Sequence, residues 1–313
     1  MLRLVVRRLL MSIPLLFVVS ALTFVLVSLT PGDAARAILG TGASQDQYLQ
    51  LRHQMGLDKP VYEQYWTWLS HAVHGDLGTS LLSSQPVTQA LNQRLQPTLS
   101  LIIGATLLSA FLGISLGVLS ALRSGVLGRA VDVFSLLGLA LPAFWLGLIL
   151  VAEFAVRLQL FPATGYTLLD QSPGQWLRGL VLPVGTLAFG SVTVVAKQTR
   201  DAMLEVLGRD FIRTLRANGV AERSIIFKHA LKNAAIPVVT VLGLIFVGLL
   251  SGTVLVESVF ALPGLGGLTV QATTGHDIPI IQGAVIYFTI IVVIVNLIVD
   301  LSYGWLNPKA RAS

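Results

Sequence analysis

Residues 98–122 read "TLSLIIGATLLSAFLGISLGVLSAL", a stretch of 25 residues without a charged side chain. About 20 consecutive apolar residues span the hydrocarbon core of a bilayer as an α-helix, so this stretch predicts a transmembrane helix. The whole chain of 313 residues agrees, because 54% of it is hydrophobic and only 12% is charged. That charged share is about half of what a soluble domain carries. The sequence therefore predicts an all-α membrane protein.

The same length criterion selects six stretches along the chain. They run approximately over Leu9–Leu29, Thr98–Leu122, Val131–Ala155, Leu180–Ala196, Ile236–Val256 and Ile280–Tyr303. The fourth stretch is the shortest. The first follows several arginines, as in a signal peptide, but it exceeds the roughly 15 apolar residues of such a peptide and no clear small-residue cleavage site follows. We expect it to remain as a membrane helix.

Basic residues gather on one side of the predicted spans. They are Arg3, Arg7 and Arg8 before the first span, Arg123 and Arg129 after the second, and Lys309 and Arg311 in the tail. The connection 197–235 adds eight basic residues against four acidic ones. Lys and Arg in short loops stay on the cytoplasmic side, so both termini are expected to be cytoplasmic. Arg157 and Arg178 lie in an outward connection, so the bias is strong but not absolute. The net charge of +6 follows from this topology, which argues against a nucleic-acid partner.

Spans and connections divide the chain into four expected parts. They are an N-terminal cytoplasmic tip with the first helix (1–30), an extracytoplasmic segment (31–96), a five-helix membrane core that contains the inward connection 197–235 (97–303), and a cytoplasmic tail (304–313). The extracytoplasmic segment is long enough for a small cap but not for an independent enzyme domain. We expect it to serve docking or gating.

Several chemistries are disfavoured by what the spans lack. The chain has no cysteine, which excludes disulfides, thiolate nucleophiles and Cys-ligated metals. Ion-coupled transporters place ionisable groups deep in the bilayer, whereas Asp132, Glu153 and Asp300 lie near span ends and Glu257 lies just past the fifth span. These positions argue against an ion-coupled secondary transporter, which is the alternative function from another class of protein. Energy supplied by another subunit is the favoured interpretation.

The second span carries small residues at every fourth position. They are Ala105, Ser109, Gly113, Gly117 and Ala121. Such a stripe predicts close helix packing, centred on Ser109, Gly113 and Gly117. Gly248 and Gly252 predict a second, weaker packing pair. The stretch "GISLG" matches G-x-S-x-G, but it lacks the strand-to-helix turn and the histidine in a span that a serine hydrolase needs.

The inward connection contains "GRDFIRTLRANGVAERSIIFKHALKNAAIP" at 208–237. Two short amphipathic helical segments are expected on either side of Gly219. A short amphipathic helix on the cytoplasmic side suits the groove of a partner protein. The alternative is a helix that lies on anionic lipid headgroups.

This connection carries the first part of a resemblance. "RTLRANG" at Arg213–Gly219 and "HALKNAAIP" at His229–Pro237 resemble the ATPase-coupling loop of the dipeptide, oligopeptide and nickel-type ABC importer permeases. The likeness is to the first of the two paired permeases. The family pattern has alanine, lysine and arginine where Leu215, Asn218 and Lys232 stand. The general importer motif has glutamate where Arg213 stands, so a salt bridge from that position to an ATPase arginine is not carried over.

The resemblance covers essentially the whole chain. Further matching pieces are "PGD" at 31–33, "MGLDKPVYEQYWTWL" and "GDLGTSL" in the outward segment, "LPAFWLG" in the third span, "FALPGLGGLTVQATTGHDIPIIQG" after the fifth, and "NLIVDLSYGWLNPKAR" at the end. The family often has tryptophan where Ala261 stands, and arginine and tyrosine where His276 and Ile278 stand. The implied architecture is a type I ABC importer permease with six transmembrane helices and cytoplasmic termini.

The resemblance also implies site residues. The residues that it implies for coupling to the ATPases are Asp210, Arg213, Thr214, Arg216, Ala217, Gly219, Glu222, His229 and Asn233. An outer gate loop falls on Pro263, Gly264, Gly266 and Asp277. No catalytic residue and no metal ligand are assigned.

The implied protein is one subunit of an ATP-driven, binding-protein-dependent ABC importer in the bacterial cytoplasmic (inner) membrane. It would form half of the translocation path. Its partners would be a second homologous permease, two cytoplasmic ABC ATPases and an extracytoplasmic solute-binding protein. "PGLGG" at 263–267 is not followed by Lys-Ser/Thr and no Walker motif is present, so the chain is expected not to be an enzyme. ATP and Mg²⁺ would be bound by the partner ATPases.

The solute is expected to be a di- or oligopeptide. The alternative is nickel or a metal chelate (metallophore), because permeases of the same family carry both, and glutathione-like peptides as well. His71 and His74, with Asp76 nearby, form an H-x-x-H pattern. Histidines on the wet side of an outward helix are usually surface residues, so no metal site is predicted there.

Overall fold

The computed structural model describes residues 2–30, 32, 34–40, 42–123, 125, 130, 138 and 140–306. Its regular elements are helices, and the β-type pairing within these ranges is an isolated bridge between Thr79 and Pro86. The all-α prediction is therefore confirmed for the described chain.

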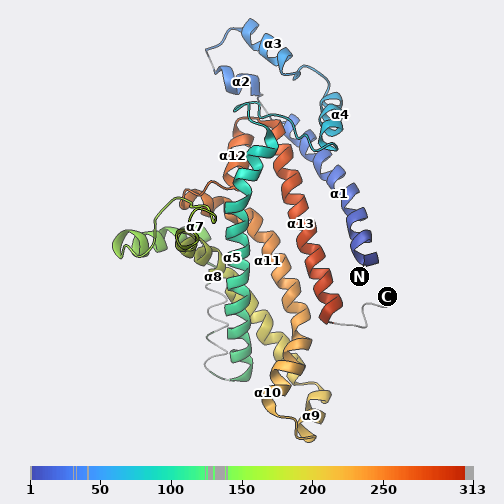
Figure 1. Ribbon diagram of the computed structural model, residues 1–313, viewed down its shortest axis with the longest axis vertical. Coiled ribbons are helices and arrows are strands. Elements are labelled where there is room, and N and C mark those ends of the chain that lie inside the picture. The colour runs from blue at the N-terminus through green and yellow to red at the C-terminus, as the bar shows by residue number, and fades with distance from the viewer. Residues whose placement is uncertain are drawn as a thin grey trace. The chain divides into compact units, whose positions relative to one another are not determined.

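Figure 1 shows the order of the helices. They are α1 (Leu2–Ser28), α2 (Ala34–Leu39), α3 (Gln45–Gln54), α4 (Val61–Ala72), α5 (Val87–Leu122), α7 (Ala143–Leu150), the π-helix η1 (Val151–Arg157), α8 (Pro173–Leu207), α9 (Asp210–Ala217), α10 (Glu222–Ser224), the π-helix η2 (Ile225–Ala230), α11 (Leu231–Val259), α12 (Leu265–Thr274) and α13 (Ile278–Leu306).

Five helical segments within the described ranges are long and apolar enough to cross a membrane. They are Val5–Ser28, Val87–Leu122, Pro173–Leu207, Glu222–Val259 and Ile278–Leu306. They contain the first, second, fourth, fifth and sixth predicted spans. The predicted third span begins in residues 131–137 and 139, which lie outside the described residues. Its described end consists of α7 after Pro142, followed by η1.

The helix that contains the fourth predicted span is longer than its apolar core indicated. This helix, α8, has 35 residues. Its start is fixed locally, since the Ser172 side chain accepts a hydrogen bond from the Gln175 N–H and Pro173 occupies the first turn. The helix continues to Leu207, and helical structure resumes at Glu222. The connection between these two long helical segments is therefore 208–221, much shorter than the expected 197–235.

The chain forms two compact units. Unit 1 contains Thr98–Leu262 and Ile294–Ser313, and unit 2 contains Leu2–Pro97 and Pro263–Val293. Helices α5 and α13 each contribute residues to both units. This division differs from the four-part division expected from the sequence, because the segment 31–96 belongs to one unit with α1 and with residues 263–293.

In unit 1, α8 packs against α7 and α11, and α5 approaches α8 at the stripe of small residues. A Cβ atom added at Gly113 would lie 2.6 Å from Val195 Cβ, and one added at Gly117 would lie 2.5 Å from Thr199 Cβ. The Ser109 hydroxyl donates to the Ala188 carbonyl at 3.5 Å. These residues therefore lie where the backbones of two helices come close together.

The predicted packing pair at Gly248 and Gly252 has no opposing helix within the described chain, so it stays a prediction. A Cβ atom added at either glycine would meet nothing within 4 Å. Four-residue spacing places the two glycines on one helix face, but spacing alone does not provide an opposing helix.

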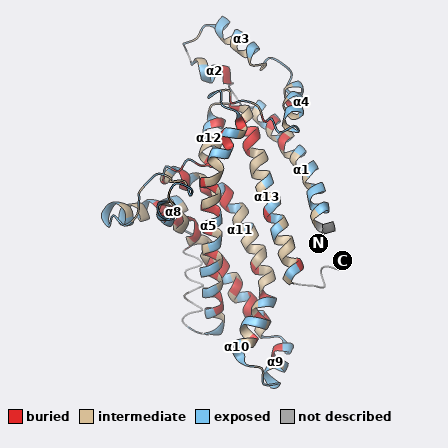
Figure 2. Ribbon diagram, viewed as in Figure 1, coloured by how far each residue is buried: buried red, intermediate tan, exposed pale blue. Residues whose placement is uncertain are grey.

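The core of unit 2 joins the start of α5 to α12 and to the start of α13. Its buried residues include Val87, Leu91, Leu265 and Ile281. The close approach requires a glycine, because a Cβ added at Gly283 would lie 2.5 Å from Val87 Cγ1. Figure 2 shows that α1 is mostly exposed, and only 11% of its most apolar window is buried inside the structure. Its apolar side chains are therefore available to lipid or to another subunit.

Candidate functional site

The loop around Gly219 is a glycine-terminated helix end. Gly219 has φ +73°, a left-handed conformation that L side chains rarely adopt. Its N–H donates to the Arg216 carbonyl at 3.0 Å, and the Val220 N–H donates to the Leu215 carbonyl at 3.1 Å. This pair of hydrogen bonds is the Schellman motif, which satisfies the last carbonyls of α9 and reverses the chain. The predicted turn at Gly219 is confirmed.

One face of α9 and the following π-helix are anchored in unit 1. Ile212 and Ile225 are fully buried, and they join Val118, Met203 and Val206 in one apolar cluster at the ends of α5 and α8. Leu215 and Val220 pack against the same cluster, as the hydrophobic contact of a Schellman motif requires. Through this cluster, α9 packs against the ends of two long helices.

The exposed part of this region carries charge. Arg216 donates two hydrogen bonds to Glu222, from Nε at 3.1 Å and from Nη2 at 2.6 Å. This bidentate pair closes the loop over Gly219, and the hydrogen bond to Glu222 raises the pKa of Arg216 above its ordinary value. Arg213 pairs within α9 with Asp210, at 3.3 Å. Arg213 and Arg216 are thus both exposed, although Arg216 lies one helical turn after the buried Ile212.

The other residues implied for coupling take simpler positions. The Thr214 hydroxyl donates to the Asp210 carbonyl at 3.2 Å, and Ala217 is an exposed residue at the end of α9. Asn233 donates from Nδ2 to the His229 carbonyl at 2.8 Å, within the helical run that leads into α11. The structure therefore gathers the loop residues 210–222 in one place, whereas His229 and Asn233 support the start of α11.

A shallow pocket of about 480 Å³ lies beside the loop. Its lining consists of Ala221, Arg223, Ser224, Phe227 and Lys228. Phe227 is 58% exposed although it is aromatic, and Arg223 and Lys228 flank it with positive charge. An aromatic side chain with a basic rim is compatible with a protein-docking surface.

The residues implied for an outer gate form a helix entrance and a helix cap. Gly264 is the N-cap of α12 and Gly266 is buried in its first turn. Asp277 is 2% exposed and precedes α13 directly. Its carboxylate accepts hydrogen bonds from the Ser80 hydroxyl at 2.5 Å and from the Leu81 N–H at 3.2 Å. Asp277 therefore anchors the segment after Gly78 to the start of α13.

Other buried polar contacts were not predicted from the sequence. They involve isolated Ser, Thr, Glu and Gln residues, which form no recognisable sequence motif. Glu257 is 1% exposed and accepts a hydrogen bond from the Thr98 hydroxyl at 2.7 Å. Its position near the end of a predicted span had indicated the membrane–water interface instead. Gln282 is fully buried and donates to the Ser20 carbonyl at 3.2 Å. The Ser20 hydroxyl in turn contacts the Tyr65 hydroxyl at 3.0 Å. These contacts join α5 to α11 in unit 1, and α1 to α4 and α13 in unit 2.

Among the described residues, the histidines at the end of α4 and just after it contact neighbouring backbone carbonyls. The Nδ1 atoms of His71 and His74 contact the carbonyls of Thr67 and Ser70, each at 2.7 Å and each one turn earlier. Asp76 accepts a hydrogen bond from the Gly78 N–H. Within the described ranges, no group of three or more His, Cys, Asp or Glu residues is placed to hold a metal ion.

Comparison with known proteins places this geometry in a family. Residues 113–312 match the model of the binding-protein-dependent transport system inner membrane component, and residues 1–102 match the N-terminal model of the same kind of component. A protein of Brucella abortus named as a peptide transport system permease is 42% identical over 98% of both chains. The glutathione transport system permease of Escherichia coli K12 is 39% identical over 99% of both chains.

A solved structure resembles the fold. The inward-facing MetNI methionine ABC transporter includes a chain that aligns with a TM-score of 0.57 at 19% identity, covering 70% of this chain and 97% of that chain. This likeness shows the helical fold of a type I ABC importer permease. With five apolar helices of spanning length among its described residues, the protein is a multi-pass protein of the bacterial inner membrane. The chain belongs to the family of binding-protein-dependent transport system inner membrane components.

Proposed function

We propose that this chain is the permease subunit of an ABC importer for di- and oligopeptides. It pairs with a second homologous permease to form the translocation path, and an extracytoplasmic binding protein delivers the solute. Two cytoplasmic ATPases bind ATP and Mg²⁺ and drive the cycle, and this chain contributes no ATPase site of its own. Relatives named for peptide and glutathione transport, at about 40% identity over nearly the whole chain, support the peptide assignment.

The proposed topology has six spans and cytoplasmic termini. The sixth span is the one that begins in residues 131–137, and the basic connections support the orientation. The loop 208–221 then faces the cytoplasm, where an ATPase reaches it.

The observation that carries the coupling proposal is the Gly219 loop. It presents Phe227 and basic side chains on one side, and it is anchored through Ile212 and Ile225 to the ends of α5 and α8 on the other. A displacement of the docked ATPase would therefore move whole helices and shift the permease between inward-open and outward-open states.

Three variants of two glycines test this coupling in the reconstituted complex. Gly219→Pro replaces φ +73° by a fixed φ near −65°, so the loop cannot form. Gly219→Asn keeps a residue type that tolerates the left-handed region. Gly208→Ala is a matched control nearby, because Gly208 has φ −80° and an added Cβ would make only ordinary contacts.

We expect Gly219→Pro to lose both binding-protein-stimulated ATPase activity and uptake, while Gly219→Asn and Gly208→Ala keep both. Co-purification of the ATPases separates failed docking from failed coupling. Normal stimulated ATPase activity and uptake in Gly219→Pro would show that this loop does not couple the subunits.

Uptake assays with the cognate binding protein test the solute. We expect labelled dipeptides to be imported in an ATP-dependent manner and to compete with one another. Import of a nickel chelate without import of any peptide would replace the proposed solute by the metal alternative.

A further inference from the structure

Helix α4 has an apolar face that the other described residues leave exposed. Tyr62, Trp66 and Val73 at the C-cap are 64%, 57% and 70% exposed, and their spacing of four and seven residues places them on one side of the helix. The neighbouring side carries Tyr65, which is buried, and Trp68, which packs against the core of unit 2. Single exposed apolar residues are ordinary, but several large ones in line are typical of a surface that a partner or a membrane covers.

The buried side of α4 packs against the apolar helix α1. The Tyr65 hydroxyl contacts the Ser20 hydroxyl at 3.0 Å and donates to the Phe17 carbonyl at 3.4 Å. The Tyr65 ring lies 6.1 Å from the Phe17 ring and 5.6 Å from the Phe24 ring, edge-on in both cases. These contacts fix the level of α4 along α1.

That level lies inside the membrane when α1 spans it. Phe17 and Ser20 precede Ser28, the last residue of α1, by about 16 and 12 Å along the helix axis at 1.5 Å per residue. The hydrocarbon core is about 30 Å thick, and the run 9–29 that contains both residues has no charged side chain. Phe17 is 45% exposed, and the Trp66 ring lies 6.3 Å from the Phe17 ring. Lipid that contacts Phe17 therefore also contacts Trp66.

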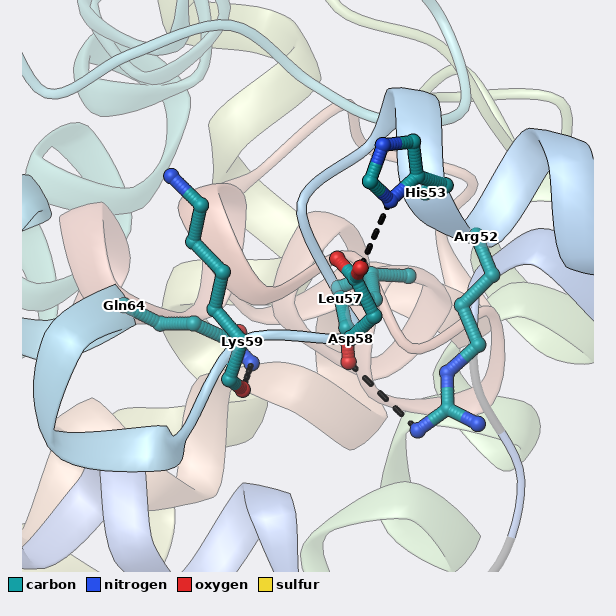
Figure 3. A network of polar contacts seen from close by, with 6 residues as sticks. All are labelled: Arg52, His53, Leu57, Asp58, Lys59 and Gln64. Atoms are coloured by element: carbon teal, nitrogen blue, oxygen red, sulfur yellow. Dashed lines mark hydrogen bonds and ion pairs between the residues drawn. The ribbon is translucent and has the colours of Figure 1, made fainter.

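Charged groups flank α4 at both ends. Before the helix, Asp58 pairs with His53 Nδ1 at 2.7 Å, and the Lys59 carbonyl accepts a hydrogen bond from Gln64 at 2.8 Å. Figure 3 shows these contacts, and it shows the Lys59 side chain extending away from Asp58. After the helix, Asp76 is exposed. With 12 residues, α4 is too short to cross a bilayer, so a position along the interface keeps both charged ends at the headgroups.

We propose that α4 is an interfacial helix, and that acyl chains of the outer leaflet cover its face of Tyr62, Trp66 and Val73. The apolar face of such a helix is buried about 5–10 Å into the boundary between headgroups and acyl chains, where Trp and Tyr side chains are enriched. The face is continuous with the lipid-facing side of α1 at Phe17, which favours lipid over a protein partner. The segment 31–96 is then held on the membrane. The choice of leaflet rests on the proposed topology, whereas the insertion rests on the contacts with α1.

Spin labels test the insertion, because the chain has no cysteine and each single-cysteine variant carries one label. Trp66→Cys and Val73→Cys place the label on the apolar face, and Thr67→Cys is the matched control on the polar side of the same helix. Leu22→Cys, at a residue of α1 that is 58% exposed, gives the value for lipid. The full chain in lipid nanodiscs is exposed to oxygen, which concentrates in acyl chains, and to chromium oxalate, which stays in water.

We expect the ratio of oxygen collisions to chromium oxalate collisions in Trp66→Cys and Val73→Cys to be at least about fivefold higher than in Thr67→Cys, and close to that in Leu22→Cys. A ratio as low as that of Thr67→Cys would place the face in water and overturn the inference.

The same labels in the complete transporter separate lipid from a protein partner. A second permease or a binding protein that covered the face would lower the collisions of both reagents in Trp66→Cys, while oxygen collisions in Leu22→Cys stayed high. That result would overturn the inference, and an unchanged lipid-like ratio would support it.

A further measurement needs no cysteine and keeps an aromatic ring beside Phe17. The tryptophan emission that is lost in Trp66→Phe is the emission of Trp66. We expect brominated lipids to quench this part of the emission and iodide to leave it nearly unquenched. Quenching by iodide without quenching by brominated lipids would overturn the inference even if the labelled variants folded poorly.

Discussion

Replacing Gly117 by alanine should destabilise unit 1 strongly, although the change adds one methyl group in a helix. The added Cβ would lie 2.5 Å from Thr199 Cβ and 2.6 Å from the Ala196 carbonyl oxygen. Carbon atoms in contact are normally about 3.5–4.0 Å apart, so α8 would have to move away from α5 by about 1 Å. No rotation of a side chain relieves the contact, because one of the two partners is backbone.

The expected cost follows from this geometry. Overpacking a close-packed site costs about 1–3 kcal/mol, and contact with a helix backbone places this site at the upper end. The intrinsic helix propensity of alanine opposes this by about 1 kcal/mol, which gives a net loss of about 2 kcal/mol. Gly104→Ala should cost less, since the added atom meets only a methyl group of Val184, at 2.9 Å. Gly248→Ala is the matched control, because its added Cβ meets nothing within 4 Å and alanine favours the helix.

The assay is reversible unfolding of the purified chain in mixed detergent micelles, followed by tryptophan fluorescence. The expected order of stability is Gly248→Ala at or above the unmodified protein, then Gly104→Ala, then Gly117→Ala. Thr199→Ala added to Gly117→Ala should restore little, because Thr199 Cβ and the Ala196 carbonyl both remain. A Gly117→Ala variant as stable as Gly248→Ala would refute the close approach of α5 and α8.

Three further substitutions probe unit 2. Asp277→Asn should weaken the anchoring of residues 80–84 by about 1.5–3 kcal/mol, because a charged acceptor of several N–H and O–H groups is lost, and hydrogen exchange of that segment measures it. Tyr65→Phe should cost about 1 kcal/mol in the unfolding assay through the lost buried hydroxyl contact, and an unchanged midpoint would argue against that contact. The hydrogen bond from His53 lowers the pKa of Asp58, so its stabilising contribution is present above the ordinary carboxyl pKa and is lost as the pH falls through the lowered value. Carboxyl ¹³C titration should show the Asp58 midpoint rising in His53→Ala, and an equal midpoint in both proteins would contradict the pairing.

Apolar length and charge placement carried most of the fold prediction. A run as apolar as 98–122 is not stable when it is exposed to water. In lipid, its backbone N–H and C=O groups must form their hydrogen bonds within a helix. The predicted ends of the spans were less accurate than their existence and order. Helix α8 extends beyond its apolar part on both sides, to Pro173 and to Leu207, because capping and packing rather than hydropathy determine where a helix ends.

The structure of the candidate coupling site could be predicted only in part from the sequence. Gly219 between two amphipathic segments predicted a turn, and the Schellman hydrogen bonds are the local physics behind that signal. The bidentate pair of Arg216 with Glu222 was not predicted, because it depends on how the loop closes in space. The predicted packing pair at Gly248 and Gly252 has no opposing helix among the described residues, since spacing marks a face of a helix but not what lies opposite it.

By itself, the sequence determined that this chain is a helical membrane protein with a basic connection before its fifth predicted span, because hydropathy, charge and glycine act locally and can be read position by position. Only the tertiary structure decided which polar groups are buried and which helices meet at glycine. Those facts depend on contacts between residues far apart in the chain, as between Ser80 and Asp277. Such contacts follow from how the helices pack, and no local pattern in the sequence records them.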